Sequence, residues 1–502
     1  MNNRISRILK ESKRKLHHRL RRRQYDHQCK PMFKGGNIKY SISEKVSAIG
    51  YGGIGAMHTL VRKLKLDRAI NRRIHLLKVH VPYHESDHVL NLAYNVVTGG
   101  TCLEDIERLR QDDSYTRALG AERIPDPTTA GDFLRRFDPE TVGDLQEIFN
   151  DTRRKVWASQ GKEFHQEAIL DVDGTIAPTT GECKGGMDIA YNGVWGYAPL
   201  LITLAHTSEV LYLVNRPGSR PSCDGAAEWM DRAIELTKPI YEKVWLRGDT
   251  DFSLTANFDR WDEQGVGFVF GYDAKQNLVA LADALPEKGW KKLRRPLPYT
   301  VKTEPRERPK RIKEQIVRGR EFKNIRLESE QVAEFEYRPT GCRKDYRMVV
   351  VRKNLSVEKG EAVLFADVRY FFYITNDRQK TAAALVFFAN GRGNQENVIA
   401  QLKNGVNALR MPADDLVPNW AYMVIAALAW NLKAWFGMQM PAAAQQQQVL
   451  RMEFKRFLTN FMLLPCQILN AGRKLVYRIL TYTDHLEAFF ATFDRIKALG
   501  SS

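Results

Sequence analysis

The spacing of apolar residues changes character along the first half of this 502-residue chain. Between residues 46 and 161, apolar side chains recur at intervals of three and four, which predicts helices with one buried face. Short apolar runs follow from Ala168 onward and are broken by a helical pattern near residues 224–243. Three strands, a helix and then more strands predict a mixed sheet whose first three strands form an antiparallel meander.

The second half of the chain returns from strands to helices. Residues 274–369 show no strong helical period and hold three strand-like runs, so we expect a β-rich insertion there. Residues 419–502 are predicted to be helical. The longest apolar stretch, Ala421–Phe436, is short and interrupted by Asn431 and Lys433, which indicates a buried core helix and not a membrane span.

Positive charge gathers at the N-terminus. The chain carries 77 Lys and Arg against 59 Asp and Glu, a net charge of +18. Residues 1–40 hold thirteen of the basic side chains and only Glu11 and Asp26 as acids, which gives this segment +11. We expect a flexible basic arm over residues 1–45 and a polyanionic partner, with nucleic acid favoured over anionic lipid.

Acidic residues end two of the predicted strands. Asp173 follows the run that begins at Ala168, and Asp249 follows the run KVWLRG. Strand alternation points Asp171 and Asp173 to the same face of the sheet, so the sequence leaves open which of the two binds a ligand. Because ligand sites usually form at the rim of a sheet, we expect these carboxylates to lie close together.

A late helical segment holds an acid between two cations. At about 100° per residue, Arg392, Glu396 and Lys403 fall within roughly 40° of one another on one helix face. If this face turns toward Asp173 and Asp249, three carboxylates meet over divalent metal while the cations hold phosphate. The combination predicts metal-dependent phosphodiester chemistry.

A phosphatase is the first alternative. An apolar strand followed by Asp-x-Asp-Gly-Thr resembles the nucleophile loop of haloacid-dehalogenase-like phosphatases, with Asp171 as nucleophile and Asp173 as general acid. That interpretation explains residues 166–251 but gives no role to the basic arm, the insertion or the helix that carries Glu396.

The full set of motifs resembles bacterial insertion-sequence DDE transposases with a ribonuclease-H-like core and a Tyr-Arg-Glu-Lys signature. The likeness rests on LDVDGT, on RGDTDF and on RGNQENVIAQLKNG, where Arg392, Glu396 and Lys403 are separated by three and six residues as in the family. One position departs from the signature, because Ala389 stands where its tyrosine would be. A phosphate-contacting hydroxyl is therefore missing or supplied by another residue.

The resemblance implies a catalytic triad of Asp173, Asp249 and Glu396 that binds Mg²⁺, for which Mn²⁺ can substitute. Two such ions would activate a water, then a freed 3′-hydroxyl, for attack at phosphorus. Arg392 and Lys403 would hold the DNA strand.

Three further residues are candidates for DNA contact. Arg135 and Arg136 follow a capped helix start in PDPTTAGDFLRRF and suit phosphate, with a solvated helix face as the alternative. Trp290, in the basic stretch KGWKKLRR, is a candidate for stacking on an unpaired base, with packing inside the insertion as the alternative.

The predicted fold class is α/β, a ribonuclease-H-like mixed sheet flanked by helices, with a β-rich insertion and an all-helical N-terminal region. The segments are a flexible basic arm (1–45), a helical DNA-binding region (46–161), the first part of the catalytic core (162–273), the β-rich insertion (274–369), the second part of the core with the Glu396 helix (370–418) and a C-terminal helical region (419–502).

The expected function is a DNA transposase that binds terminal inverted repeats, cleaves the element ends and joins 3′-hydroxyls to target DNA. Its partners would be double-stranded DNA and a second copy of the chain in a synaptic homodimer. No secretory signal is visible, so we expect a cytoplasmic, nucleoid-associated protein without membrane contact. A non-catalytic DNA-binding relic of a mobile element is a further alternative, and the intact acids weigh against it.

Zinc is not predicted from the sequence. The six cysteines show no Cys-x-x-Cys spacing. His80, His84 and His88 are spaced by four, but Pro82 disfavours one continuous helix across them and no fourth ligand is evident.

Overall fold

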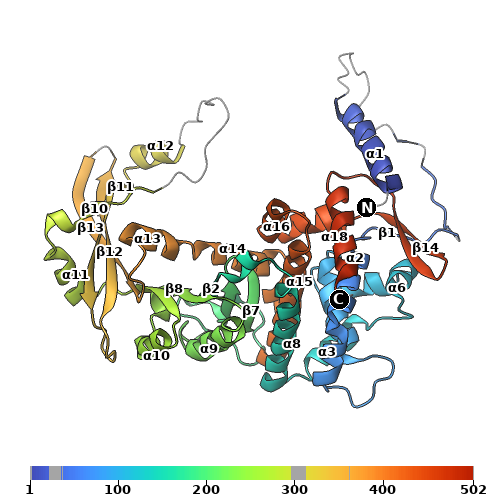
Figure 1. The fold of residues 1–502 in the computed structure, drawn as a ribbon, viewed down its shortest axis with the longest axis horizontal. Helices are drawn as coiled ribbons and strands as arrows, with labels where there is room; N and C mark the ends of the chain where they lie inside the picture. The colour runs from blue at the N-terminus through green and yellow to red at the C-terminus, as the bar shows by residue number, and fades with distance from the viewer. Residues whose placement is uncertain are drawn as a thin grey trace.

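The computed structural model describes residues 3–21, 35–36, 38–43, 45–295, 312–360 and 362–500. Its centre is a nine-stranded sheet in the order β10-β11-β12-β13-β9-β8-β2-β6-β7. A helical region made from both ends of the chain packs beside the β7 end of this sheet (Figure 1). Within the described ranges, no helix has the length and apolar character needed to cross a membrane.

Five strands form the core half of the sheet. They are β2 (Glu167–Gly174), β6 (Leu200–Leu204), β7 (Glu209–Val214), β8 (Lys243–Gly248) and β9 (Gly267–Tyr272). β2, β6 and β7 are successively antiparallel, whereas β8 runs parallel to β2 and β9 parallel to β8. The predicted meander is confirmed, and the mixed α/β sheet agrees with the expected ribonuclease-H-like class.

Burial on both faces explains the continuous apolar runs of the core strands. Every residue of β6 and β7 is buried. Helix α9 (Ala226–Thr237) packs against both strands, and α15 (Leu416–Met438) packs against β7. Strands covered in this way lose the alternation of apolar and polar residues that marks a half-exposed sheet.

The insertion continues the core sheet. Its strands are β10 (Lys291–Lys292), β11 (Lys323–Tyr337), β12 (Tyr346–Lys359) and β13 (Ala362–Thr375), with helices α11 (Gln276–Asp283) and α12 (Ile312–Gly319). The last four residues of β13, Phe372–Thr375, pair antiparallel with β9. The three strands predicted from the sequence are present, and they belong to the same sheet as the acids.

The N-terminal helical region is assembled around α15. Its helices are α2 (Ile54–Leu64), α3 (Leu66–Arg73), α4 (Glu85–Val97), α5 (Asp105–Arg110), α6 (Asp113–Leu119), α7 (Pro127–Leu134) and α8 (Pro139–Trp157). Helix α15 contacts α4, α7 and α8, and nearly all of its residues are buried. The stretch Ala421–Phe436 is thus a core helix, as predicted.

The C-terminal region is not wholly helical, which corrects the sequence prediction. Helices α16 (Ala443–Leu450), α17 (Phe454–Phe457) and α18 (Leu486–Ala498) are separated by a hairpin of β14 (Cys466–Ala471) and β15 (Lys474–Ile479). Strand β14 also pairs with β1 (Ala48–Ile49). The turn residues Gly472 and Arg473 both have positive φ, of 56° and 61°, which is the conformation of a two-residue hairpin turn.

Residues 3–21 of the predicted basic arm form helix α1 (Asn3–Arg21), and residues 22–34 of that arm lie outside the described residues. Ile5, Leu9 and Leu16 fall on its partly buried side at helical spacing. Leu9 packs against the hydrophobic core, and α1 contacts α18. The apolar stripe, masked in the sequence by the dense basic residues, gives the segment a helical structure.

A buried ion pair ties the helical region to the sheet. Arg153 of α8 pairs with Glu209 of β7 at 2.9 Å, and both side chains are almost completely buried. The indole N–H groups of Trp157 and Trp435 donate to the same carboxylate at 2.9 and 2.7 Å. Because breaking such a pair leaves an unpaired buried charge, this contact fixes α8, β7 and α15 together.

Candidate active site

Two acids lie at neighbouring strand ends. Asp173 is the penultimate residue of β2, and Asp249 follows the last residue of β8 directly. The two strands are adjacent and parallel, so their carboxyl ends meet at one edge of the sheet. The carboxylate of Asp249 accepts a hydrogen bond from the backbone N–H of Asp251 at 3.1 Å, which fixes its orientation.

One guanidinium group links the third acid to this edge. Helix α14 (Gly393–Asn404) carries Glu396 in its first turn, and Arg392 is the residue before the helix. Arg392 Nη1 lies 2.8 Å from Asp173 Oδ2, and Nη2 lies 3.7 Å from Glu396 Oε1. Asp249, Arg392 and Glu396 line a cleft with a volume of about 510 Å³. The structure therefore brings together Asp173, Asp249, Arg392 and Glu396, as the sequence predicted.

A buried side-chain amide positions helix α14. Gln395 Nε2 donates to the backbone oxygen of Asp171 on β2 at 2.9 Å and to that of Leu201 on β6 at 3.3 Å. Gln395 precedes Glu396, so the same contact that holds the helix on the sheet directs Glu396 outward. Its side chain is 66% exposed and faces the solvent side of the cleft.

Negative charge accumulates at the strand ends. Burial raises the pKa of Asp173 to about 6, with Asp249 and Glu396 adding to the effect and Arg392 opposing it. Burial also raises the pKa of Asp249, again against the effect of Arg392. Two partly buried carboxyl groups with raised pKa values mark a place where a cation would be stabilising.

The carboxylates of Asp173, Asp249 and Glu396 are suitable ligands for a divalent cation, but Arg392 lies between two of them. In the described part of the chain, Asp173, Asp249 and Glu396 do not form a group of ligand atoms all within 4.8 Å of one another. The Arg392 guanidinium lies between two of them instead. Carboxylate oxygens are the ligands that Mg²⁺ and Mn²⁺ prefer, so the residue types suit a divalent metal.

Asp171 is structural, which answers a question the sequence left open. Its side chain is 1% exposed and accepts two hydrogen bonds from Arg247, at 2.5 and 2.8 Å. Arg247 Nη1 also donates to the backbone oxygen of Phe388 at 2.6 Å. Both oxygens of Asp171 are occupied, so it is not available as a nucleophile. The phosphatase interpretation loses its central residue.

A tyrosine that the sequence analysis missed lines the same cleft. Tyr373 of β13 shares the cleft with Arg392 and Glu396, and its hydroxyl donates to Asn390 Oδ1 at 3.3 Å. Ala389, which replaces the tyrosine of the signature, lines this cleft as well. Motif spacing gave no signal for Tyr373, because it reaches the site from a strand of the insertion.

The remaining candidate residues have different surroundings. Lys403 is exposed in the last turn of α14 and has no ion-pair partner among the residues described. Arg135 pairs with Asp132 at 3.0 Å and with Asp414 at 3.1 Å. Arg136 is exposed and donates to the backbone oxygen of Leu76 at 3.4 Å.

The position of Trp290 does not agree with the expectation that it stacks on a base. Its side chain is 7% exposed, and the Arg352 guanidinium lies 4.3 Å from the ring centroid. The ring packs within the insertion beside Tyr370. A buried ring with one face already covered by a cation offers no free face to a base, so the packing alternative holds for this residue.

The family model for the transposase DDE domain, group 1, matches residues 44–501. The chain belongs to this family. Its members generally use divalent metal ions, in agreement with the acidic cleft of this transposase. No curated protein matches the sequence. Among solved structures, the chain is similar to a piggyBac transposase in a synaptic complex with hairpin DNA, with 12% identity, a TM-score of 0.33 and coverage of 82% of this chain and 81% of that chain.

Proposed function

We propose that this transposase is of the bacterial insertion-sequence type, cleaves DNA at the ends of its element and joins the 3′-hydroxyls to target DNA. The observation that carries the proposal is the convergence of Asp173, Asp249 and Glu396 on one Arg392-centred cleft. Acids from three distant parts of the chain meet there, and two of them, Asp173 and Asp249, are partly buried with raised pKa values.

Asp173, Asp249 and Glu396 would hold Mg²⁺, or Mn²⁺ in its place. When bound, the metal supplies activation of the attacking hydroxyl and stabilisation of the leaving oxygen in phosphodiester transfer. The chain's own contribution is to hold the three carboxylates on rigid elements, two at strand ends and one on a helix that Gln395 anchors to the sheet.

Arg392 would exchange partners when DNA enters. In the free protein its guanidinium neutralises Asp173 and Glu396. A phosphodiester offers the same guanidinium two oxygens in a fork geometry, so the strand replaces the carboxylates as its partner. Tyr373, from the insertion side of the cleft, would supply the hydroxyl that Ala389 lacks, and exposed Lys403 would add a point charge farther along the strand.

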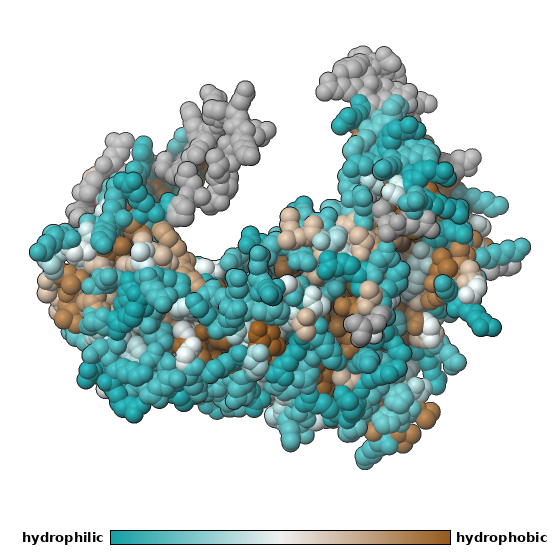
Figure 2. All heavy atoms as spheres, in the orientation of Figure 1, coloured by the Kyte–Doolittle hydropathy of each residue, from teal (hydrophilic) through white to brown (hydrophobic). Residues whose placement is uncertain are grey.

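The DNA path would follow two basic projections. In Figure 1, helix α1 and the insertion rise on the same side at opposite ends of the molecule, with α13 (Ala382–Asn390) and α14 between them. Figure 2 shows that this face is hollowed and largely hydrophilic. Terminal repeats would bind across the hollow, with Arg135 and Arg136 as further phosphate contacts. Two ends require two active sites, so we propose a homodimer in the synaptic complex.

The test uses DNA that flanks the coding region, where short inverted repeats are expected. Glu396→Gln removes the charge of the third acid without changing its size. This variant should bind the repeat DNA as the wild type does in a gel-shift assay, and Mg²⁺-dependent strand cleavage should fall by about 10³-fold or more.

Asp251→Asn is the matched control, because Asp251 is an exposed acid on the same loop as Asp249 and is not a proposed ligand. It should cleave normally. Undiminished cutting by the Glu396→Gln variant would remove Glu396 from the active site. Binding without cleavage by the wild type would instead identify a non-catalytic relic.

A further inference from the structure

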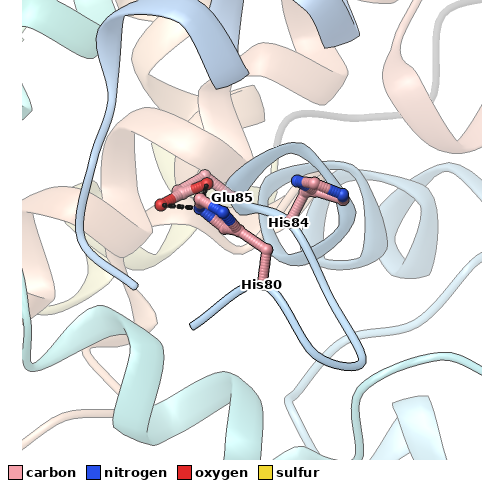
Figure 3. Close-up of side chains that lie close together, drawn as sticks. All are labelled: His80, His84 and Glu85. Atoms are coloured by element: carbon pink, nitrogen blue, oxygen red, sulfur yellow. Dashed lines mark hydrogen bonds and ion pairs between the residues drawn. The ribbon is translucent and has the colours of Figure 1, made fainter. Parts of the chain in front are cut away.

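A second group of potential metal ligands lies far from the acidic cleft, in the N-terminal helical region. His80 and His84 belong to the loop between α3 and α4, and Glu85 is the first residue of α4 (Figure 3). One ligand atom from each of these residues lies within 4.8 Å of the other two, and no other group in the described part of the chain meets this criterion.

Glu85 is a buried carboxylate, and one of its two oxygens has no hydrogen-bond partner among the described residues. The residue is 0% exposed, and its Oε1 accepts the backbone N–H groups of Leu76 and Leu77 at 3.1 Å each. His80 Nε2 is hydrogen-bonded to Oε1 at 3.3 Å and lies 3.2 Å from Oε2, which has no hydrogen-bond partner among the residues that the structure describes. A buried, unsatisfied carboxylate oxygen is costly unless a cation faces it.

The two histidines are already gathered beside this oxygen. Their rings are stacked, with centroids 4.8 Å apart and an interplanar angle of 18°. The stack keeps both imidazole rings close to the Glu85 carboxylate. Both histidines are exposed, so an ion can reach their rings from solvent.

Distances and donor types agree with a transition metal. Ligand atoms about 2.0–2.2 Å from one Zn²⁺ ion lie roughly 3.3–3.6 Å from each other in tetrahedral geometry. His80 Nε2 and Glu85 Oε2, at 3.2 Å, are close to this spacing, and the ligand atom of His84 lies within 4.8 Å of both residues' ligand atoms. Two imidazoles and one carboxylate suit Zn²⁺, whereas Mg²⁺ prefers oxygen ligands throughout.

We propose that His80, His84 and Glu85 bind one Zn²⁺ ion, separate from the ions of the acidic cleft. Three protein ligands leave a fourth position open to water or to another ligand. The ion would fasten the loop before α4 to the helix itself. His80 also lines a cleft of about 780 Å³, whose charged residues include Arg62, Arg123, Asp87 and Glu122, so the ion would lie beside a polar recess.

The structure explains why the sequence argued against zinc here. The segment around Pro82 is not helical, as predicted, but the third ligand is Glu85 and not His88. His88 is buried in α4 and stacks on Phe133, with ring centroids 4.4 Å apart. The loop around Pro82 folds His80 back toward the start of α4. The four-residue spacing of the histidines in the sequence does not predict this contact.

The test is a Zn²⁺ titration by calorimetry on the full chain after treatment with a chelator. All variants carry Glu396→Gln, so that the acidic cleft contributes equally. The parent should bind Zn²⁺ at the His80 site, and His80→Ala and His84→Ala should each weaken that binding by about 100-fold. Mg²⁺ titrations should be the same for all variants.

His75→Ala is the matched control, because His75 is an exposed histidine of the same loop that is not a proposed ligand. It should bind Zn²⁺ like the parent. Glu85→Gln gives a second measurement and should weaken binding while circular dichroism remains unchanged. Equal Zn²⁺ binding by the parent and the His80→Ala, His84→Ala double variant would overturn the proposal. Absence of saturable Zn²⁺ binding to the parent would do the same, and would leave only a His80–Glu85 ion pair.

Discussion

At the scale of single residues, Asp173, a proposed catalytic group, shows how a partly buried acid weakens the fold. Its carboxyl has a pKa of about 6 in the folded chain, raised from 3.8 by burial and by Asp249 and Glu396. Ionisation is therefore harder in the folded state than in the unfolded state. This cost is fully present above pH 6 and disappears below about pH 4, where both states are protonated.

Replacement of Asp173 by Asn should therefore stabilise the protein while abolishing cleavage. We expect a gain of about 1–3 kcal/mol in the free energy of unfolding at pH 8, because each pKa unit corresponds to about 1.4 kcal/mol. The measurement is urea unfolding in the presence of a chelator at pH 8 and at pH 4. The gain should shrink toward zero at the lower pH, and a variant less stable than the wild type at pH 8 would contradict the argument.

The acids were the residues that the sequence could reveal, because strand ends and helical offsets are local patterns. Asp173, Asp249 and Glu396 were identified in this way, and the structure brings them to one cleft. Partners across the fold were not predictable. The Asp171–Arg247 ion pair and the approach of Tyr373 both depend on which strands become neighbours.

At the scale of elements, the junction between α13 and α14 explains an irregularity in the sequence. Gly391 lies between the two helices, where glycine normally weakens helical structure. A Cβ atom at this position would lie 2.4 Å from Arg247 Nη1 and 3.1 Å from the backbone oxygen of Phe388. The absence of a side chain therefore allows Arg247 to reach Phe388 while it holds Asp171.

Gly391→Ala should destabilise the protein by about 1–3 kcal/mol, because the Arg247 guanidinium is fixed by Asp171 and cannot move away freely. Gly393→Ala is the matched control in the first turn of α14, where an added Cβ meets no described atom within 4 Å. It should be neutral or stabilising by up to about 1 kcal/mol. Thermal unfolding of both variants provides the comparison, and equal melting temperatures would refute this role of Gly391.

The sequence predicted those helices and strands whose own apolar residues follow a clear pattern. Strands β6 and β7 of the core meander, and the first part of β12 in the insertion, are continuous apolar runs. The hairpin Cys466–Ile479 was missed because its second strand is mostly exposed, and α1 because its basic residues outnumber its apolar stripe. In both cases a contact with a segment distant in sequence adds stability that the local pattern does not predict: β14 pairs with β1, and α1 packs against α18.

At the scale of the whole molecule, positive charge is concentrated on helix α1, which projects from the body of the protein. Helix α1 contains eight Lys and Arg residues against one acid, Glu11, and meets the body of the protein through few residues. A basic helix in this position adds phosphate contacts without adding much to the stability of the core.

Deletion of residues 1–21 should therefore weaken DNA binding and make it less dependent on salt. The slope of log K against log salt concentration should fall by about 0.9 for each phosphate that α1 neutralises in the full chain. Fluorescence anisotropy from 50 to 300 mM salt measures the slope, and thermal unfolding checks that the core is intact. An unchanged slope would show that α1 does not bind DNA.

The long strands of the insertion decide how the molecule can accommodate a duplex. Only Phe372–Thr375 of β13 are joined to β9, so residues 362–371 extend about 33 Å past that seam at roughly 3.3 Å per residue. Near the seam, swinging the insertion as a hinged lid would require hydrogen bonds of the main sheet to break. Bending is therefore confined to the ends of the insertion strands that lie farthest from β9. These ends can move toward a duplex while Asp173, Asp249 and Glu396 keep their spacing.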